Sequence, residues 1–384
     1  MKVYIYSEAQ DKIEKSGVGR AVYHQKNAAQ RAGFTVVDKL EDADVVHINT
    51  VLPNSYAMAK KLNKRGIPLV YHAHSTREDF RNSYIGSNLA AGLFKHWITA
   101  CYSCGDVIVT PSGYSKSLLE GYGINKEIYV VSNGIDLDDY KRDEQAGRKF
   151  REKYGFSDND KVVMSAGLLI RRKGVHDFVE LARRCPGYKF IWFGDADLNF
   201  VGNEVRRAVK TAPGNMIFGG YVGKDKIKAA LSGADLFLFP SYEETEGIIV
   251  LEALAMRIPV LLRNIPVYEE WNCSCEGGGR TTLILPDPST NLRSLQGVYL
   301  KSVCPLLLRE VMNRFAPRAL TKRASCFFRH MSARYSFAGS ACQKAIRTAD
   351  PQKQKFSFNS SFKRRCMPFF KNHGSLYTTD VLAG

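Results

Sequence analysis

The sequence has no long hydrophobic segment. Among its 384 residues, no uninterrupted apolar run approaches the roughly 18 residues that a membrane-spanning helix requires. The first residues, MKVYIYSEAQ, also lack the basic and apolar regions that are typical of a secretory signal peptide. We therefore expect a cytoplasmic protein, and we expect any membrane contact to be peripheral.

Acidic residues are scarce in one part of the chain only. Residues 272–384, which we call the tail, carry 18 Lys and Arg but only 5 Asp and Glu. Residues 1–271, which we call the body, carry 37 Lys and Arg and 33 Asp and Glu. The formal net charge of +17 therefore comes mostly from the tail. Because the basic excess is not a property of the body, it does not indicate a nucleic-acid-binding protein, and we predict no nucleic-acid partner.

Patterns of metal ligands and of nucleophilic triads are also lacking in the body. Of nine cysteines only Cys101, Cys104 and Cys185 lie there, and no second pair follows at the spacing of a zinc site. We interpret the cysteines as packing residues. Asp195 and Asp197 have no third ligand nearby in the sequence, so we interpret them as turn residues. We expect no metal ion and no cofactor.

Short apolar runs alternate with helical patterns throughout the body. The first half contains KVYIYS, DVVHINT, IPLVYHAHS and DVIVTPS, and the second contains KVVMSAG, YKFIWFGD, ADLFLFPS and IPVLLR. Such alternation predicts parallel sheets covered by helices. We predict an α/β fold with two doubly wound, Rossmann-like domains that face each other across a cleft. They span residues 1–136 and 161–271, with a linker over residues 137–160.

Ligands of open parallel sheets bind beyond the carboxyl ends of the strands. The residues that follow the apolar runs are therefore the candidate site. In the first domain Gly17 and Gly19 would let the backbone approach a phosphate at a helix start, or would form only a tight turn. His74 ends another strand there. His47 and His72 lie within apolar runs and are interpreted as core residues. The second domain offers residues 167–174, 194–197 and 241–247.

The segment SYEETEGIIVLEALA, residues 241–255, places Glu252 inside an otherwise apolar helical pattern. This glutamate either binds ligand hydroxyls or is a partly exposed helix residue. A carboxylate can accept hydrogen bonds from two vicinal hydroxyls, and a charged hydrogen bond contributes about 1.5–3 kcal/mol. Ligand binding is the favoured interpretation for Glu252. Glu243 and Glu246 are interpreted as solvent-facing.

The same segment resembles the signature of retaining GT-B glycosyltransferases of family four. In that signature two glutamates, separated by seven residues, flank a glycine, and here they are Glu244 and Glu252 around Gly247. SNGIDLDDY (132–140) is similar to the family's interdomain segment, and GLLIRRKG (167–174) to its phosphate loop. HAHSTREDFRNSYIGSN (72–88) resembles bacterial enzymes that build glycosyl-diacylglycerols. The resemblance covers the body and ends there.

The resemblance implies a nucleotide-sugar donor, UDP-glucose or UDP-galactose, bound without a metal. Glu252 would bind the ribose, Glu244 the hydroxyls of the transferred sugar, and Lys173 the diphosphate. The family's arginine directly after the glycine is replaced by Leu168, so Arg171 and Arg172 are the alternatives for a second phosphate ligand. The implied catalytic residues are His74, Arg172, Lys173 and Glu244. The implied donor-binding residues are Gly17, Gly19, Gly167, Arg171, Lys173, Gly247 and Glu252.

The resemblance further implies transfer of a hexose, with retention of configuration, to diacylglycerol or a glycosyl-diacylglycerol. Two alternatives stay open. One is a soluble or polysaccharide acceptor. The other is an inactive GT-B-like protein, for which Leu168 and the atypical tail are the reasons.

A membrane-facing surface is predicted around NLAAGLFKHWITACY (88–102). There Leu89, Leu93, Trp97 and Ile98 lie near one helical stripe, and a basic segment upstream contributes Lys60, Lys61, Lys64 and Arg65. Such a surface suits anionic lipid headgroups. The alternative is a core-facing stripe beside a solvated face. With the resemblance, we predict peripheral association with the inner face of the cell membrane.

The tail loses the alternation of strands and helices and is rich in Cys and Ser. In members of the family, the second domain is expected to continue at this point with a further strand and with helices that complete the domain. We predict that the tail is poorly ordered. It is either the product of a shifted reading frame or a fused foreign sequence, or a genuine basic appendage that binds anionic lipid.

Overall fold

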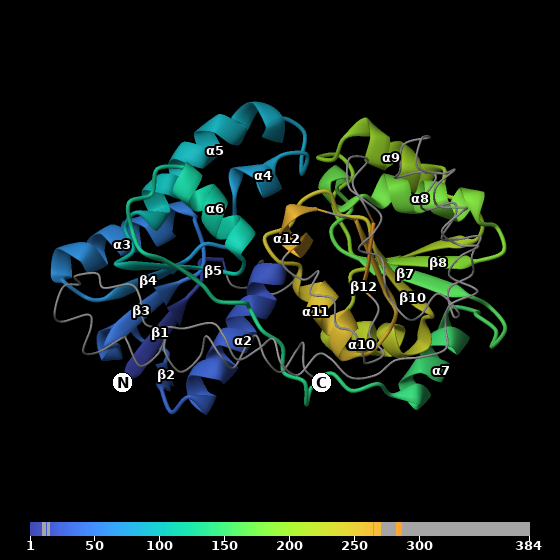
Figure 1. The fold of residues 1–384 in the computed structure, drawn as a ribbon, viewed down its shortest axis with the longest axis horizontal. Helices are drawn as coiled ribbons and strands as arrows, with labels where there is room; N and C mark the ends of the chain where they lie inside the picture. The colour runs from blue at the N-terminus through green and yellow to red at the C-terminus, as the bar shows by residue number, and fades with distance from the viewer. Residues whose placement is uncertain (10–12, 14–15, 264, 270–281, 286–384) are drawn as a thin grey trace, which may run out of the picture.

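The computed structural model describes residues 1–9, 13, 16–263, 265–269 and 282–285. These residues form two parallel sheets, each with helices packed against its faces, and the two units lie side by side (Figure 1). The predicted α/β fold with two Rossmann-like domains is confirmed. Within the described residues, no helix is long and apolar enough to cross a membrane.

The first domain contains a six-stranded sheet of order β2-β1-β3-β4-β5-β6. Its elements are β1 (Lys2–Tyr6), α2 (Gly17–Arg31), β2 (Thr35–Val37), η1 (Leu40–Asp42), β3 (Val45–Ile48), α3 (Pro53–Arg65), β4 (Leu69–His72), α4 (Arg77–Phe80), α5 (Ser87–Tyr102), β5 (Val107–Thr110), α6 (Gly113–Gly121) and β6 (Ile128–Val130).

The second domain contains a six-stranded sheet of order β12-β11-β10-β7-β8-β9. Its elements are α7 (Glu144–Lys153), β7 (Val162–Ala166), η2 (Arg171–Lys173), α8 (Val175–Arg184), β8 (Lys189–Phe193), α9 (Asn203–Lys210), β9 (Met216–Gly220), α10 (Lys224–Gly233), β10 (Leu236–Phe239), α11 (Ile248–Ala255), β11 (Val260–Arg263), α12 (Pro266–Glu269) and β12 (Thr282–Leu285).

One strand lies outside the range predicted for the second domain. β12 pairs in parallel with β11 and forms the edge of the sheet, although the sequence analysis ended this domain at residue 271. The sheet therefore continues into what we called the tail. The prediction of a poorly ordered tail otherwise falls on residues outside those described. The segment predicted as a linker contains helix α7.

Burial on both faces explains why the strands are continuous apolar runs. All five residues of β7 are buried, with Val163 in the core on one side of the sheet, and Val162 and Met164 in the core on the other. Parallel sheets need such runs because helices cover both of their faces. The three cysteines of the body are buried, as packing residues are expected to be.

Helix α5 divides the predicted membrane stripe. Ile98 is completely buried in the core, whereas Leu89 and Leu93 are 92% and 79% exposed. Trp97 is partly buried and donates its indole N–H to the carbonyl of Val51 at 2.6 Å. The prediction that these four residues form one stripe on a single face is therefore wrong. The carboxyl-terminal half of α5 packs on the sheet, while its first turns face solvent.

Candidate active site

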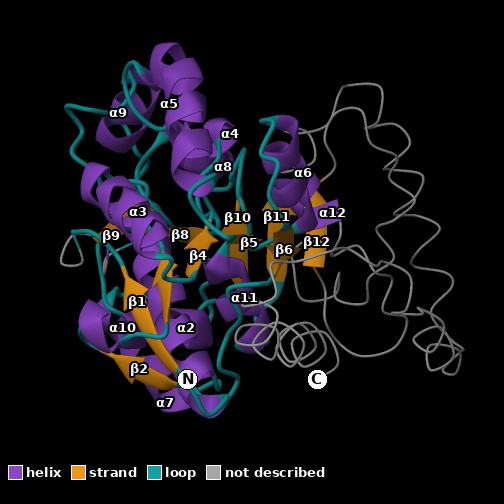
Figure 2. Ribbon diagram, turned by 90° about the vertical axis from the view of Figure 1, so that its left-hand side faces the viewer, coloured by secondary structure: helices purple, strands orange, loops and turns teal. Residues whose placement is uncertain are grey.

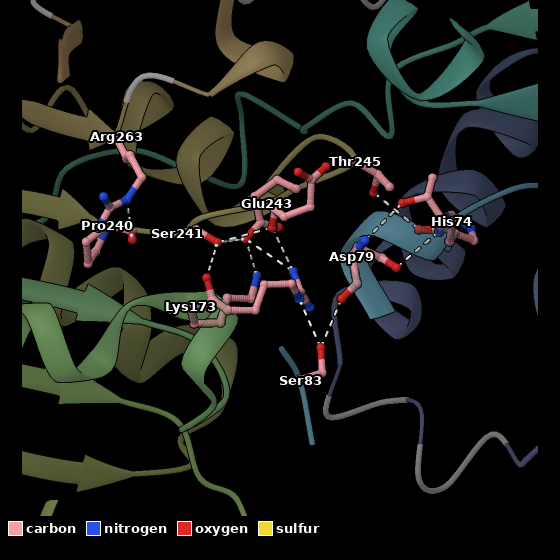
Figure 3. Close-up of polar contacts among 12 residues, drawn as sticks. His74, Asp79, Ser83, Lys173, Pro240, Ser241, Glu243, Thr245 and Arg263 are labelled. Atoms are coloured by element: carbon pink, nitrogen blue, oxygen red, sulfur yellow. Dashed lines mark hydrogen bonds and ion pairs between the residues drawn. The ribbon is translucent and has the colours of Figure 1, made fainter. Parts of the chain in front are cut away.

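The candidate residues of the second domain lie where the strand order reverses. The chain adds β8 and β9 on one side of β7, and β10, β11 and β12 on the other. The loops after β7 and β10 therefore leave the sheet beside each other and in opposite directions, which creates the usual binding position of doubly wound folds. The first loop carries Gly167 and Lys173, and the second carries Ser241 and Glu244. Figure 3 shows Lys173 of the first loop beside Ser241 of the second.

Glu244 is the centre of a buried charged group. Its Oε1 accepts hydrogen bonds from Lys173 Nζ and Ser241 Oγ, both at 2.5 Å, and lies 3.6 Å from Arg172 Nη1. Burial opposes ionisation of the carboxyl, but the positive charges of Lys173 and Arg172 outweigh it and lower the pKa of Glu244 below its ordinary value. Burial also lowers the pKa of Lys173, against the opposing effect of Glu244. The group places two cations beside one carboxylate, and the carboxyl groups of Asp79 and Glu243, whose pKa values burial raises to about 6 and about 7, also interact with it.

Two glycines determine the backbone conformation of the loop after β7. Gly174 has φ +74°, and a Cβ there would lie 2.2 Å from the carbonyl oxygen of Pro240. No other residue fits without displacing one of the two loops. Gly167 has φ +153°, and the aliphatic part of Lys173 lies 3.4 Å from where its Cβ would be. The lysine therefore packs along the backbone and its Nζ reaches Glu244.

The two arginines of this loop have different surroundings. Arg172 donates to the carbonyl of Glu243 at 2.8 Å and to Ser83 Oγ at 3.2 Å, so it lies between the domains. Arg171 is about half exposed and pairs with Glu204 at 2.8 Å. Of the two alternatives, Arg172 is the one that lies beside Lys173 and Glu244. Leu168, where the family has arginine, is 38% exposed.

Glu252 is completely buried in the second turn of α11. It forms an ion pair with Arg20 of α2, and its Oε1 accepts from the hydroxyl of Tyr140 at 3.0 Å. Its other oxygen, Oε2, is buried without a hydrogen-bond partner. The interpretation as a partly exposed helix residue is wrong, and the unpartnered oxygen fits a carboxylate that receives a ligand hydroxyl. Gly247, which precedes α11, has φ +88° and makes room for Tyr268.

His74 belongs to the first domain, and its backbone contacts the loop that carries Glu244. It follows β4, its Nε2 lies 2.9 Å from Asn49 Oδ1, and its carbonyl accepts from Thr245 Oγ1 at 3.2 Å. Its ring stacks on His72 with centroids 4.0 Å apart. Burial, and then the charge of His47, lowers the pKa of His74 to about 3. Burial therefore favours the neutral imidazole, which can donate one hydrogen bond and accept another. His47 and His72 are buried, as predicted.

Gly17 and Gly19 begin helix α2. The hydroxyl of Ser16 caps this helix by accepting from the Gly19 backbone N–H. A Cβ at Gly17 would meet nothing within 4 Å, so this position has open space in front of it. Their role in binding stays a prediction.

Glu246 is a functional candidate that the sequence analysis missed. It is 3% exposed, and its Oε2 accepts from both the backbone and the side-chain nitrogen of Asn133, at 3.1 and 2.6 Å. Burial raises the pKa of Glu246 to about 7, against the hydrogen bonds from Ser132 and Asn133. The interpretation as a solvent-facing residue was wrong, because the first domain covers this loop. Glu243 is partly buried, and burial raises its pKa to about 7 as well.

The described residues contain no group of three His, Cys, Asp or Glu side chains that could hold a metal ion. Asp195 and Asp197 accept from the backbone N–H groups of Ala196 and Asn199, respectively, as turn residues do.

Comparison with known proteins identifies the class first. Residues 30–139 match the family Glycosyltransferase Family 4, and residues 147–288 match Glycosyl transferases group 1. The second match extends past residue 271 and includes β12. Among solved structures, Anabaena HepE in complex with UDP and glucose superposes with a TM-score of 0.54 at 18% identity, over 73% of this chain and 85% of HepE. Sucrose-phosphate synthase from Thermosynechococcus elongatus gives a TM-score of 0.54 at 16% identity, over 85% of this chain and 81% of the synthase. The fold is that of GT-B glycosyltransferases.

Two relatives then identify the family. A processive diacylglycerol alpha-glucosyltransferase of Acholeplasma laidlawii is 44% identical over 273 residues, which cover 71% of this chain and 81% of the relative. An alpha-galactosylglucosyldiacylglycerol synthase of Streptococcus pneumoniae is 26% identical over 260 residues, which cover 66% of this chain and 69% of the relative. The chain belongs to glycosyltransferase family 4 and resembles its glycolipid synthases.

Proposed function

We propose that this enzyme transfers a hexose from UDP-glucose or UDP-galactose to diacylglycerol or a glycosyl-diacylglycerol, with retention of configuration. The observation that carries the proposal is the group of Lys173, Arg172 and Glu244 at the switch point of the second domain, where the loop that carries Glu244 contacts His74 of the first. The two relatives named above act on lipids of this class, which supports the acceptor.

The donor's charge matches the site. A nucleotide sugar carries two phosphates, and negative charge develops on the diphosphate as the bond to the sugar breaks. Lys173 and Arg172 provide two positive charges in a buried position, where they stabilise such charge more strongly than in water. Glu252 would receive a ribose hydroxyl on its unpartnered Oε2. Glu244, held by Lys173, would orient hydroxyls of the transferred sugar.

Retention without a covalent enzyme intermediate requires donor and acceptor to react on the same face of the sugar. We infer that the acceptor hydroxyl attacks from the face that the diphosphate leaves. The new bond joins the acceptor oxygen to the anomeric carbon, the bond from that carbon to the phosphate oxygen breaks, and the hydroxyl proton passes to the departing phosphate. Neutral His74 would hold a sugar hydroxyl through this step without accepting the proton itself.

The test is a transfer assay with both donors and with separate acceptors. Purified protein is incubated with radiolabelled UDP-glucose or UDP-galactose and with dioctanoylglycerol, glucosyl-dioctanoylglycerol or maltose. The expected result is an alpha-linked glycolipid, identified by chromatography and by the coupling constant of the anomeric proton. Transfer to maltose alone favours the soluble acceptor. Hydrolysis of neither donor, and transfer to no acceptor, favours the inactive alternative.

A further inference from the structure

Five polar side chains form a hydrogen-bonded network at the carboxyl ends of strands β3 and β4. They are Gln25 of α2, His47 and Asn49 at the end of β3, and His72 and His74 at the end of β4. Helix α2 packs on the sheet beside β1, and β3 and then β4 follow β1 in the sheet (Figures 1 and 2). Asn49 and His72 are each 3% exposed. Burial lowers the pKa of all three histidines, so the neutral forms are favoured throughout the network.

The contacts in this network assign the proton of His74. The amide nitrogen of Gln25 donates to Asn49 Oδ1 at 2.8 Å and lies 2.9 Å from His72 Nδ1, which accepts its second hydrogen. Asn49 Oδ1 also lies 2.9 Å from His74 Nε2. An amide oxygen can only accept, so His74 carries its proton on Nε2. Because a neutral imidazole has one N–H, Nδ1 of His74 is an acceptor.

This protonation state limits what His74 can bind. Asn49 already uses one of its two nitrogens, so a ligand must meet Nδ1 and must donate a hydrogen to it. A hydroxyl can donate, whereas an ionised phosphate oxygen can only accept. The ring of His72, stacked at 4.0 Å between centroids and 6° between planes, also fixes the plane of the imidazole. His74 can therefore recognise a sugar or glycerol hydroxyl, but not the diphosphate of a donor.

Stability alone does not explain the network. Asn49 Nδ2, His72 Nε2 and Gln25 Oε1 are buried without a hydrogen-bond partner among the residues that the structure describes. Each such group costs stability, and most buried polar groups in proteins are paired. What the arrangement does provide is a fixed orientation of His74, because Gln25 holds Asn49 and Asn49 holds the imidazole.

We propose that Asn49 and Gln25 are positioning residues, which hold His74 with its proton on Nε2 so that Nδ1 accepts a hydrogen bond from a hydroxyl of the substrate. Asn49 acts directly on His74, and Gln25 acts through Asn49. The proposal rests on the proposed function for the identity of the substrate. The protonation of His74 itself can be measured in the protein without any substrate.

The first experiment measures that protonation. Protein labelled with ¹⁵N-histidine gives long-range proton–nitrogen correlation spectra, and His74→Asn identifies the signals of His74 among the eight histidines. The parent should show a protonated Nε2, a bare Nδ1, and an Nε2 proton that exchanges slowly with water. A proton on Nδ1 instead, which is the pattern with both amides turned over, overturns the proposal.

Variants in the same spectra test whether Asn49 holds the ring. Asn49→Ala removes the acceptor, and the Nε2 proton should exchange at least about fivefold faster. Asn49→Asp keeps an oxygen that accepts from Nε2–H and should keep the slow exchange. Gln30→Ala, at an exposed amide on the same helix as Gln25, is the control and should match the parent. Unchanged exchange in Asn49→Ala overturns the role of Asn49.

Kinetics then separates positioning from a general structural effect. Asn49→Ala should lower kcat by at least about tenfold, because a small misplacement of an orienting group lowers turnover. The Kd for UDP, which lacks the transferred hexose, should stay unchanged. Gln25→Ala should lower kcat less, and the double variant should fall no further than Asn49→Ala alone. Losses that multiply in the double variant, or a parent-like kcat in Asn49→Ala, overturn the proposal.

Two arms of the assay identify the hydroxyl. A loss that also appears when water hydrolyses the donor places the hydroxyl on the hexose, and a loss confined to transfer places it on the acceptor. Either result supports the positioning of His74. A parent that neither hydrolyses a donor nor transfers to any acceptor counts against the proposed function, while the spectra still decide where His74 carries its proton.

Discussion

Arg20 of the first domain forms an ion pair with Glu252 of the second, although 232 positions separate them in the chain. The glutamate side chain is completely buried and that of the arginine is 26% exposed. Breaking a buried pair on one side leaves an uncompensated charge and is costly. The pair therefore joins α2 to α11 and holds Oε1 of Glu252, while Oε2 stays available for a ligand.

We predict that Glu252→Gln weakens nucleotide-sugar binding by about tenfold or more. An amide oxygen accepts a ribose hydroxyl less strongly than a carboxylate, and a charged hydrogen bond is worth about 1.5–3 kcal/mol. Calorimetric titration with UDP measures the effect. Glu144→Gln, at an exposed carboxylate on α7, is the control. Equal UDP affinity in the parent and in Glu252→Gln would remove the ribose assignment.

Lys173→Ala should lower kcat by about 10²–10³-fold, the range for removing one charge-stabilising donor, and should change KM much less. The reason is that its charge acts mainly on the diphosphate as negative charge develops. Steady-state kinetics with the preferred donor separates the two parameters.

Arg171→Ala is the control for Lys173→Ala, because Arg171 is in the same loop but pairs with Glu204 and Asn82 instead. It should retain most of the activity. A loss confined to KM in Lys173→Ala would make the lysine a ground-state contact.

The sequence predicts the sheets well because each strand can be recognised from its own residues, without knowledge of contacts to distant parts of the chain. Each strand is an apolar run that ends at small or polar residues, and such runs are typical of parallel sheets. The switch-point loops could be located for the same reason. β12 was missed because its short run lies among the Gly, Pro and Ser of the tail, without a helical pattern before it.

The burial of individual site residues could not be predicted from local patterns. Glu246 looks like a loop carboxylate in the segment EETE, but it is buried and contacts Asn133, 113 positions away. The stripe of α5 has helical spacing, but spacing does not say which turns meet the sheet. In both cases the missing information is the placement of one element against another.

Gly174→Ala should destabilise the protein more than Gly155→Ala. Both glycines have similar positive φ, +74° and +68°, so both substitutions carry the backbone strain of a left-handed residue. Only at Gly174 would the new Cβ collide, 2.2 Å from the Pro240 oxygen, whereas Gly155 has open space. We expect a loss of about 1 kcal/mol at Gly155 and a larger loss at Gly174, with weaker UDP binding at Gly174 alone. Urea unfolding and titration measure both, and equal losses would show that the loop moves aside freely.

The last prediction concerns pH and Glu246. Its pKa is raised from the ordinary 4.5 to about 7 in the folded protein. The folded state therefore binds the proton more tightly than the unfolded state, and the stability that this provides is fully present below about pH 4.5 and lost as pH rises through 7. The shift corresponds to on the order of 3 kcal/mol. Glu246→Gln mimics the protonated form and keeps an oxygen that can accept from Asn133.

We expect Glu246→Gln to match the parent in free energy of unfolding at pH 4.5 and to exceed it at pH 8, so that the difference between the two proteins grows across this range. Urea unfolding at several pH values measures it. Glu243, whose pKa is also raised to about 7, remains in both proteins and cancels from the difference. Glu144→Gln, at an exposed carboxylate, is the control for loss of one negative charge. A Glu246→Gln variant that is less stable than the parent at pH 8 would show that the charged carboxylate stabilises the contact between the domains.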